Sequence, residues 1–318
     1  MTAKPLIIDC DPGADDAIAL LLALAFPEKL NLLGITTVAG NVPLALTQRN
    51  ARFICDLAGK RNIPIYAGCP RPLVRSLQTA EQVHGKTGLD GLAVSEPTLP
   101  LQPQHGVEFL IQTLLQATAP ITIATLGPLT NLAVALVQQP KIGPRIQDIV
   151  IMGGAVTHGN VTPSAEFNFY TDPHAAHVVL TSGLPITVFS LDVTHQVIAT
   201  PDRIQAIRTL AAPLGEAVAS LLLHYGRYDQ QRHGISGSYL HDPCVIAYLL
   251  QPELITSYAA HVVMEIASEL TMGRLVVDVW NVTQAPPNAK VVHTIDPDGF
   301  FQLLLQGLSR LPTPDLKG

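Results

Sequence analysis

The chain has 318 residues, of which 47% are hydrophobic and 14% are charged. A formal net charge of −6, without any run of lysine or arginine, argues against a nucleic-acid backbone as the partner. The small charged fraction favours a large core, or a subunit that buries surface against copies of itself. Neither an internal repeat nor a low-complexity linker divides the sequence, so we expect one domain over residues 1–318.

The cysteines and the N-terminus bear on the compartment. Four cysteines are scattered without a CxxC pair, which is typical of reduced thiols in a cytosolic protein: Cys10, Cys55, Cys69 and Cys244. Residues 1–5 lead straight into an apolar strand, which leaves no room for a signal peptide. The apolar run 17–26 is about half of the roughly 20 residues that a membrane span needs. We therefore expect a cytoplasmic protein.

Short apolar runs alternate with helical patterns over the first two thirds of the chain. Strands are predicted at residues 6–8, 32–37, 63–66, 121–124, 148–152 and 186–190. Helices are predicted between them, at residues 17–26, 45–58, 107–117, 131–138 and 173–181. Continuously apolar strands separated by helices indicate an α/β protein with a Rossmann-like, open, mostly parallel sheet and helices on both faces.

The last third is organised differently. A mainly helical stretch covers residues 201–250, and strands are predicted at residues 261–266, 275–280 and 290–294. The only tryptophan, Trp280, falls in the second of these strands, and a helix is predicted at residues 299–308. The polar segment 67–92 is too long for a simple connector and is interpreted as a loop of the functional site.

Polar side chains follow the predicted strands of the sheet. Asp11, Asn41 and Thr125 come at the ends of strands, and so do the segment 160–168 and Asp192. Ligands of open α/β sheets bind beyond the carboxyl ends of the strands. We therefore expect these polar positions to meet at one site.

Residues 9–16 carry four carboxylates in eight positions, between an apolar strand and an apolar helix. Asp9 and Asp11 lie two apart at the strand end, and Asp15 and Asp16 open the helix after a Pro-Gly turn. Four acids this close repel one another unless they are protonated, hydrogen-bonded or bridged by a cation. Helix capping accounts for one or two of them. A cation that prefers oxygen ligands, such as Ca2+ or Mg2+, accounts for all four.

Six motifs then point to a family. They are DCDPGADDA at 9–17, TTVAGN at 36–41, TLGPLTN at 125–131, IMGG at 151–154, EFN at 166–168 and HDP at 241–243. In this order and over nearly the whole chain they resemble the nucleoside hydrolases, the inosine-uridine preferring nucleoside N-ribohydrolases. The resemblance implies the nucleoside hydrolase fold and hydrolysis of the N-glycosidic bond of ribonucleosides to ribose and free base by a Ca2+-bound water.

The resemblance also implies roles for individual residues. Ca2+ would be held by Asp11, Asp16, Asp242 and the backbone carbonyl of Thr125, with Asp11 also the general base. The ribose hydroxyls would be bound by Asp15, Asn41, Asn160, Glu166 and Asn168. The chemistry is consistent with these roles, because carboxylates stabilise the positive charge that develops on the sugar and a metal activates water. A single displacement by water corresponds to an inverting glycosidase.

Some of these residues also have simpler interpretations. Glu166 and Asn168 could be polar residues of a loop that leads into a helix beginning at Asp172. Turn chemistry could explain Asn41, which follows a glycine at a strand end. Asp172 and Asp192 are interpreted as structural.

Two histidines are assigned to the base. A neutral imidazole at His241, beside Asp242, could donate a proton to the departing base. A histidine here places the chain in the His-bearing subgroup of the family, and His84 resembles the histidine of the family's base-side loop. Tyr225, Tyr228 or His233 could contact the base, and an exposed helix end explains them equally well.

Two other classes of protein were weighed. A haloacid-dehalogenase-like phosphatase also begins with Asp-x-Asp on a strand, but the sequence lacks its downstream lysine and acidic pair. A non-catalytic nucleoside or sugar receptor needs neither the acid cluster nor His241. The favoured function is a ribonucleoside hydrolase of nucleoside salvage that acts on pyrimidine ribosides such as uridine, with activity on purine ribosides such as inosine left open. The resemblance further implies a homo-oligomer, a tetramer or a dimer, and a small-molecule substrate without nucleic-acid or membrane partners.

Overall fold

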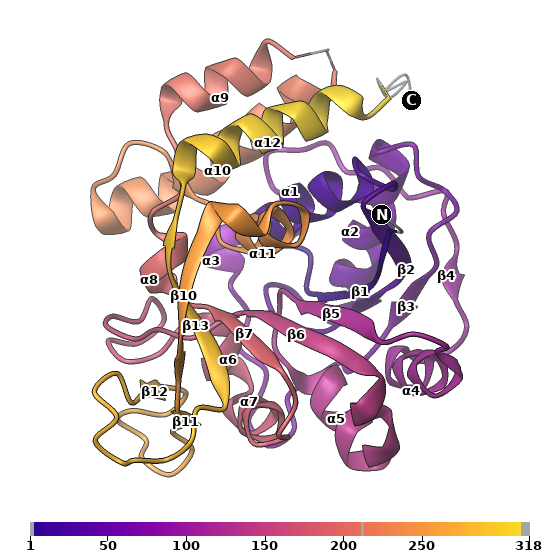
Figure 1. Ribbon diagram of the computed structural model, residues 1–318. Coiled ribbons are helices and arrows are strands. Elements are labelled where there is room, and N and C mark those ends of the chain that lie inside the picture. Colours follow the sequence, from indigo (N-terminus) through magenta and orange to yellow (C-terminus); the bar gives the residue numbers. More distant parts are fainter. Residues whose placement is uncertain (1–2, 211–212, 313–318) are drawn as a thin grey trace.

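A nine-stranded sheet forms the centre of the protein (Figure 1). The computed structural model describes residues 3–210 and 213–312. In spatial order the strands are β10 (Ile255–Ala260), β13 (Ala289–Ile295), β7 (Ile186–Phe189), β6 (Ile146–Met152), β5 (Ile121–Thr125), β1 (Lys4–Cys10), β2 (Leu30–Thr37), β3 (Ile65–Ala67) and β4 (Leu101–Gln102). All neighbouring strands are parallel except β10, which runs antiparallel to β13. The predicted fold class is confirmed.

The central strands are apolar because both of their faces are covered. Along β1, Leu6 and Ile8 pack into one hydrophobic cluster, and Ile7 between them packs into a second cluster on the other face. All three side chains are fully buried. A strand buried on both faces has no need for a polar alternate position, which is the origin of the continuous apolar runs.

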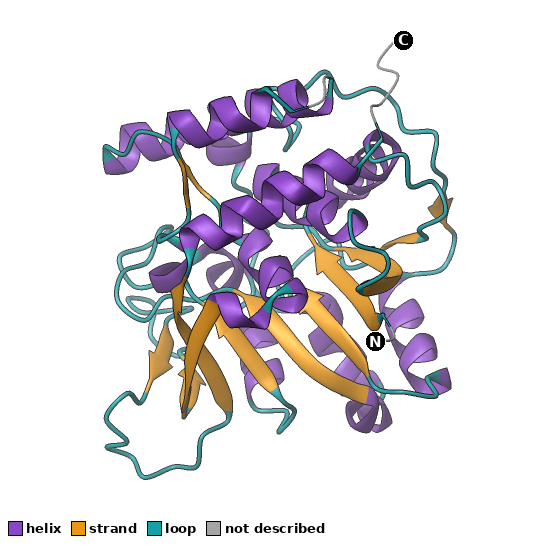
Figure 2. Ribbon diagram, turned by 45° about the horizontal axis from the view of Figure 1, so that its top comes forward, coloured by secondary structure: helices purple, strands orange, loops and turns teal. Residues whose placement is uncertain are grey.

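Helices cover the two faces of the sheet (Figure 2). One face packs against α1 (Ala14–Leu24), α2 (Leu44–Leu57), α11 (Asp242–Leu250) and α12 (Pro297–Arg310). The other face packs against α4 (Gly106–Gln116), α5 (Thr130–Gln138) and α7 (Pro173–Leu180). As predicted, Asp172 begins a helix: its carboxylate accepts a hydrogen bond from Ala175 N at 3.0 Å and caps α7.

The remaining elements lie around the carboxyl edge and the margins of the sheet. The stretch 201–250 contains α9 (Pro201–Arg208) and α10 (Leu214–His233) before α11, and a small sheet pairs β8 (Ile198–Ala199) with β9 (Ser238–Tyr239). Short helices are α3 (Glu81–His84), α6 (Phe167–Thr171), α8 (Leu191–Thr194), η1 (Pro140–Arg145) and η2 (Pro252–Leu254). Among the described residues, no helix combines the length and the apolar character needed to cross a membrane.

Two predictions near the C-terminus are corrected. The strand predicted at 275–280 ends at Val277, where β12 (Leu275–Val277) pairs with β11 (Val262–Met264) in a separate two-stranded sheet. Trp280 therefore lies outside a strand and is 86% exposed. The chain turns here because the carboxylate of Asp278 accepts hydrogen bonds from Val282 N and Thr283 N. Strand β10 was not predicted, because an edge strand with exposed Thr and Ser positions lacks an apolar run.

Candidate active site

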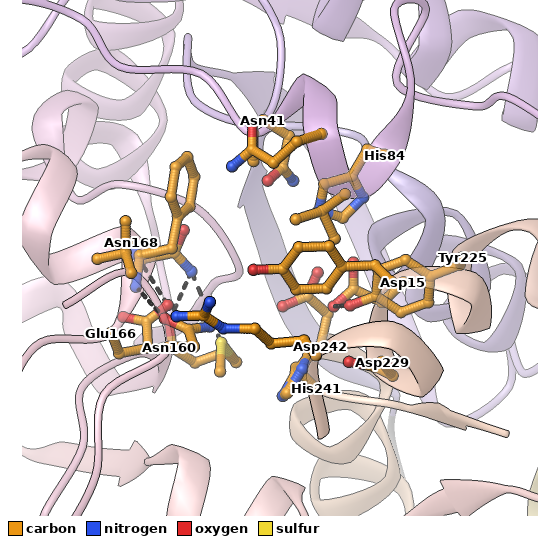
Figure 3. A pocket seen from close by; sticks show the side chains of 18 of the residues that line it. Asp15, Asn41, His84, Asn160, Glu166, Asn168, Tyr225, Asp229, His241 and Asp242 are labelled. Carbon is orange, nitrogen blue, oxygen red and sulfur yellow. Dashed lines mark hydrogen bonds between the residues drawn. The ribbon is translucent and has the colours of Figure 1, made fainter. Parts of the chain in front are cut away.

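A cavity of about 220 Å³ opens at the carboxyl edge of the sheet (Figure 3). Its lining includes eight of the residues singled out from the sequence: Asp15, Asn41, His84, Asn160, Glu166, Asn168, His241 and Asp242. The segment 67–92 contributes to the same wall through Ala80, Gln82, Val83 and His84. Asp11, Asp16 and Thr125 are fully buried and are not part of the lining. The structure thus brings residues that are up to 227 positions apart, from Asp15 to Asp242, to one site.

Three carboxylates meet beside this cavity. Asp15, Asp16 and Asp242 each offer an oxygen, and these oxygens lie within 4.8 Å of one another. Asp15 and Asp16 stand in the first turn of α1 and Asp242 is the first residue of α11. The two helices pack together, so their positive N-terminal ends face the same group of acids.

Burial makes this group of acids unfavourable without a positive partner. Removal from water raises the pKa of Asp15, and the charge of Asp16 raises it further. Burial, then the charges of Asp15 and Asp16, raise the pKa of Asp242 well above its usual range. Oxygen ligands of this kind suit a hard cation such as Ca2+ or Mg2+ and not a soft metal. The cluster could therefore hold a metal ion.

Asp11 borders this cluster without being part of the three-carboxylate group. Its backbone N–H donates to Asp16 Oδ1 at 3.2 Å, and its Oδ2 accepts from Asn41 N at 2.7 Å. Its Oδ1 is buried without a hydrogen-bond partner among the described residues. A Cβ atom added at Gly40 or at Gly127 would collide with the Asp11 carboxylate, so both glycines allow the backbone to approach it closely. A bound cation could supply the partner that this oxygen lacks.

Asn41, which follows β2, is hydrogen-bonded to residues that follow β1. Its side-chain Nδ2 donates to Asp16 Oδ2 at 3.1 Å and to the Asp11 carbonyl at 3.2 Å. Thr125 ends β5 and pairs in register with Asp9 of β1, which brings it to the same edge of the sheet. The predicted ligands Asp11, Asp16, Asp242 and Thr125 are thus gathered at one edge, and Asp15 stands among the acids as well.

Backbone groups satisfy much of the polar capacity on the opposite wall. Glu166 caps α6, because its carboxylate accepts from Gly154 N, Asn168 N and Phe169 N at 2.8–3.1 Å. Asn168 Nδ2 donates to the Leu126 carbonyl at 2.7 Å, and Asn160 Oδ1 accepts from Phe167 N at 3.0 Å. Within the described residues, Asn168 Oδ1 and Asn160 Nδ2 make no hydrogen bond, so these two atoms remain for a ligand.

The two histidines that were assigned to the base lie on the other side of the cavity. His241 Nδ1 lies 2.8 Å from Thr194 Oγ1, and His84 Nδ1 accepts from Ala14 N at 3.1 Å. The His84 ring stacks on Tyr225 with 5.2 Å between the centroids. Burial lowers the pKa of His84 to about 3 and that of His241 well below its usual range. Both rings are therefore neutral at neutral pH.

Sequence reasoning missed several residues of this wall. His195 stacks on Tyr239 with 4.1 Å between the centroids and lines the cavity beside His241. Asp229 and Arg232 of α10 were missed as well; they line the cavity together with Tyr225, Tyr228 and His233, which the sequence had offered as possible contacts to the base. The available signal was the helical spacing of Tyr225, Asp229 and His233, which are four residues apart and share one face of α10.

The class of protein that the site indicates agrees with the family that comparison with known proteins identifies. An open, mostly parallel sheet with buried acids and imidazoles around one cavity at its carboxyl edge is typical of an enzyme of the α/β class. The sequence model of the family described as inosine-uridine preferring nucleoside hydrolase matches residues 6–302. The chain belongs to this family.

Relatives and solved structures extend over nearly all of the chain. It is 45% identical over 308 residues to the pyrimidine-specific ribonucleoside hydrolase RihA of Shewanella sp. strain MR-7, covering 96% of each chain. An uncharacterized protein of Schizosaccharomyces pombe is 46% identical to this chain. The match covers 96% of this chain and 99% of that protein. A plant nucleoside hydrolase superposes with a TM-score of 0.90 at 32% identity, covering 96% of this chain and 99% of the other.

A purine-preferring ribonucleoside hydrolase of Gardnerella vaginalis superposes with a TM-score of 0.89 at 31% identity, covering 96% of this chain and 98% of the other. The predicted family, and with it the prediction of an enzyme of the nucleoside hydrolase class, is confirmed. The phosphatase and the non-catalytic receptor are not favoured.

Proposed function

We propose that this chain hydrolyses the N-glycosidic bond of ribonucleosides, with Ca2+ as its cofactor, and releases ribose and the free base. One observation carries the proposal: a single cavity has a group of buried carboxylates at its floor and two buried histidines on one wall. Carboxylates can stabilise a positively charged sugar and imidazole can assist a departing base. The site therefore provides for both partners of the broken bond.

Ca2+ would be held by Asp11, Asp16, Asp242 and the Thr125 carbonyl, in the predicted set. The unpartnered Oδ1 of Asp11 and the mutual approach of Asp16 and Asp242 support this set. When bound, the ion would supply Lewis-acid activation of a water molecule and oxygen-binding positions for the ribose diol. Asp15 lies in the same group of acids, and its carboxylate is also exposed to the cavity, where a ribose hydroxyl would reach it.

Asp11 would take the proton from the attacking water. Its carboxylate is fixed by Asn41 N on one oxygen and is unpaired on the other, which is the arrangement that a positioned general base requires. Asn41, held by Asp11 and Asp16, would bind the ribose 2'-hydroxyl together with Asp15.

The opposite wall would bind the remaining ribose hydroxyls. Asn168 Oδ1 would accept from a hydroxyl, and Asn160 Nδ2 would donate to one. Glu166, with its oxygens already accepting from three backbone N–H groups, would hold Asn168 in place as well as face the sugar.

His241 would assist the departing base. If Thr194 Oγ1 donates to Nδ1, the ring carries its proton on Nε2, the nitrogen that remains for the cavity. Negative charge that develops on the base would favour the protonated ring and oppose the effect of burial on its pKa. His84 would lie along the base as a neutral ring.

Pyrimidine ribosides are the proposed preferred substrates, because relatives that are 45% identical to this chain are named pyrimidine-specific. Purine ribosides such as inosine are the second candidates, because a structural neighbour is purine-preferring. Steady-state rates of base release from uridine, cytidine, inosine and adenosine, in the presence of Ca2+, test the proposal. The proposal would be refuted if the enzyme cleaved none of these four nucleosides.

We further propose that the enzyme works in the cytoplasm, in nucleoside salvage, as a homo-oligomer (a tetramer or a dimer). The four cysteines are unpaired thiols, as expected in a reducing compartment. The small charged fraction supports burial of surface between copies.

A further inference from the structure

Helix α10 presents a buried carboxylate to the part of the cavity that the ribose does not use. Tyr225, Asp229 and His233 share one face of this helix, and all three line the cavity. Figure 3 shows Asp229 near Tyr225 and His241, away from Asn160, Glu166 and Asn168 on the other wall. If the proposed function is correct and the ribose lies between the acids and that other wall, the base extends toward α10.

One oxygen of Asp229 is already engaged and the other is not. Oδ2 accepts from the backbone N–H of Tyr239 in β9 at 3.0 Å. No hydrogen bond or ion pair in the described part of the chain reaches Oδ1. Asp229 is only 6% exposed, but Oδ1 is not among the fully buried atoms, and the residue lines the cavity. Oδ1 is therefore a free acceptor that a ligand in the cavity can reach.

The chemistry of a nucleobase matches this acceptor. Uracil has one N–H on its ring, at N3, and cytosine carries an exocyclic amino group at C4. Both donors lie on the edge of the ring that points away from the sugar. Carboxylates accept hydrogen bonds from such base edges, as aspartate does from the cytosine amino group.

We propose that Asp229 Oδ1 accepts a hydrogen bond from an N–H group on the distal edge of the base, and that Asp229 thereby sets which bases the enzyme accepts. This inference rests on the proposed function and deepens it. Tyr239 N fixes the carboxylate, so the acceptor is oriented before the nucleoside enters.

The Asp229→Asn variant is the sharpest test, because it preserves the shape of the side chain. Asparagine has one acceptor oxygen, so it can accept from Tyr239 N or from the base but not from both. Catalytic efficiency is measured on two substrate pairs: uridine with 3-methyluridine, and cytidine with N4,N4-dimethylcytidine. In each pair the second substrate lacks the N–H donor.

We expect the wild-type enzyme to prefer the N–H-bearing substrate by about 10- to 100-fold in at least one pair, the usual effect of a hydrogen bond to a charged group. Asp229→Asn should reduce that preference by a similar factor. A change in the uridine pair alone identifies the ring N–H as the donor, and a change in the cytidine pair alone identifies the amino group. Equal use of both members of each pair by the wild-type enzyme, or unchanged preferences in the variant, would overturn the inference.

Two controls separate this inference from other failures. Glu216→Gln makes the same chemical change on α10, at an exposed residue that pairs with Arg208, and should leave all preferences unchanged. Nitrophenyl riboside has no N–H on its leaving group, so Asp229→Asn should slow its hydrolysis much less than that of the N–H-bearing nucleosides. If the wild-type enzyme, supplied with Ca2+, cleaves neither nitrophenyl riboside nor any nucleoside, the proposed function itself fails. Cleavage with unaltered preferences refutes the role of Asp229 only.

Discussion

His241 Nδ1 lies 2.8 Å from Thr194 Oγ1, although the two residues are 47 positions apart in the sequence. The hydroxyl comes from α8, after β7, and the imidazole comes from the residue before α11. This contact fixes the ring and leaves Nε2 for the cavity. The orientation of the His241 ring therefore depends on a contact that the sequence does not reveal.

The first prediction concerns help to the leaving group. His241→Ala should slow cleavage of uridine by ~10²–10⁴, which is the usual contribution of a general acid. Nitrophenyl riboside needs no protonation to leave, so its rate should fall far less. Parallel assays of the two substrates check this, and an equal loss for both would mean that His241 only positions the ligand.

The second prediction concerns the contact with Thr194. Thr194→Val has nearly the same shape and removes the hydroxyl, so the His241 ring loses the partner that selects its tautomer. The rate on uridine should fall, by less than in His241→Ala, and the rate on nitrophenyl riboside should change little. Thr194→Ser retains the hydroxyl and should restore most of the activity, whereas a serine variant as slow as the valine variant would speak against the contact.

The third prediction concerns the metal ion and includes a measurement apart from activity. The proposed Ca2+ site consists of acids that the unfolded chain does not bring together, so Ca2+ should raise the free energy of unfolding. At a concentration 100 times its Kd the gain is about 2.7 kcal/mol, seen as a higher melting temperature. Asp242→Asn should abolish this increase.

Removal of Ca2+ with a chelator should stop nucleoside cleavage, and its return should restore it. Full activity of the metal-free protein, or a melting temperature that does not respond to Ca2+, would contradict the proposed cofactor.

The fourth prediction concerns Asp11. Asp11→Asn can still accept from Asn41 N, but it loses the negative charge that is proposed to bind Ca2+ and to accept a proton. At saturating Ca2+ and substrate, kcat should fall by ~10²–10⁴, because the general base is lost and not only the binding of the ion. Asp148→Asn, near the opposite edge of the sheet, makes the same chemical change and should leave kcat unchanged. Recovery of full kcat by Asp11→Asn at high Ca2+ would remove the base role.

The fifth prediction concerns the ribose. Loss of the 2'-hydroxyl leaves Asp15 and Asn41 without their proposed hydrogen-bond partner. It also removes one of the oxygen atoms that are proposed to bind Ca2+. Sites built to bind a hydroxyl reject its absence by ~10⁴–10⁵. Uridine should therefore exceed deoxyuridine in kcat/KM by orders of magnitude, while exchange of the base should matter less. Comparable hydrolysis of both substrates would refute the assignment of the diol.

Much of the fold could be predicted from the sequence because its signals are local. The buried strands β1, β5 and β6 are runs of apolar residues, and each is bounded by the turn or helix that follows it. Asp15 and Asp16 lie in the first turn of α1, after Pro12-Gly13, and Asp172 caps the N-terminus of α7. Hydrogen bonds and steric limits between neighbours in the chain determine these features. The exposed edge strand β10 and the turn at Trp280 were missed, because neither carries a local apolar pattern.

The assembly of the site was decided by tertiary structure. Packing of α11 on α1 brings a carboxylate oxygen of Asp242 to within 4.8 Å of carboxylate oxygens of Asp15 and Asp16, although more than two hundred residues separate them in the sequence. The position of α10 over the carboxyl edge brings Asp229 and His233 to the cavity, whereas the sequence alone left open whether this segment contacts the base or forms an exposed helix end. A residue's type states what chemistry it can perform. Which groups share a cavity, and which of their atoms remain unpaired, depends on contacts between distant segments that no local pattern records.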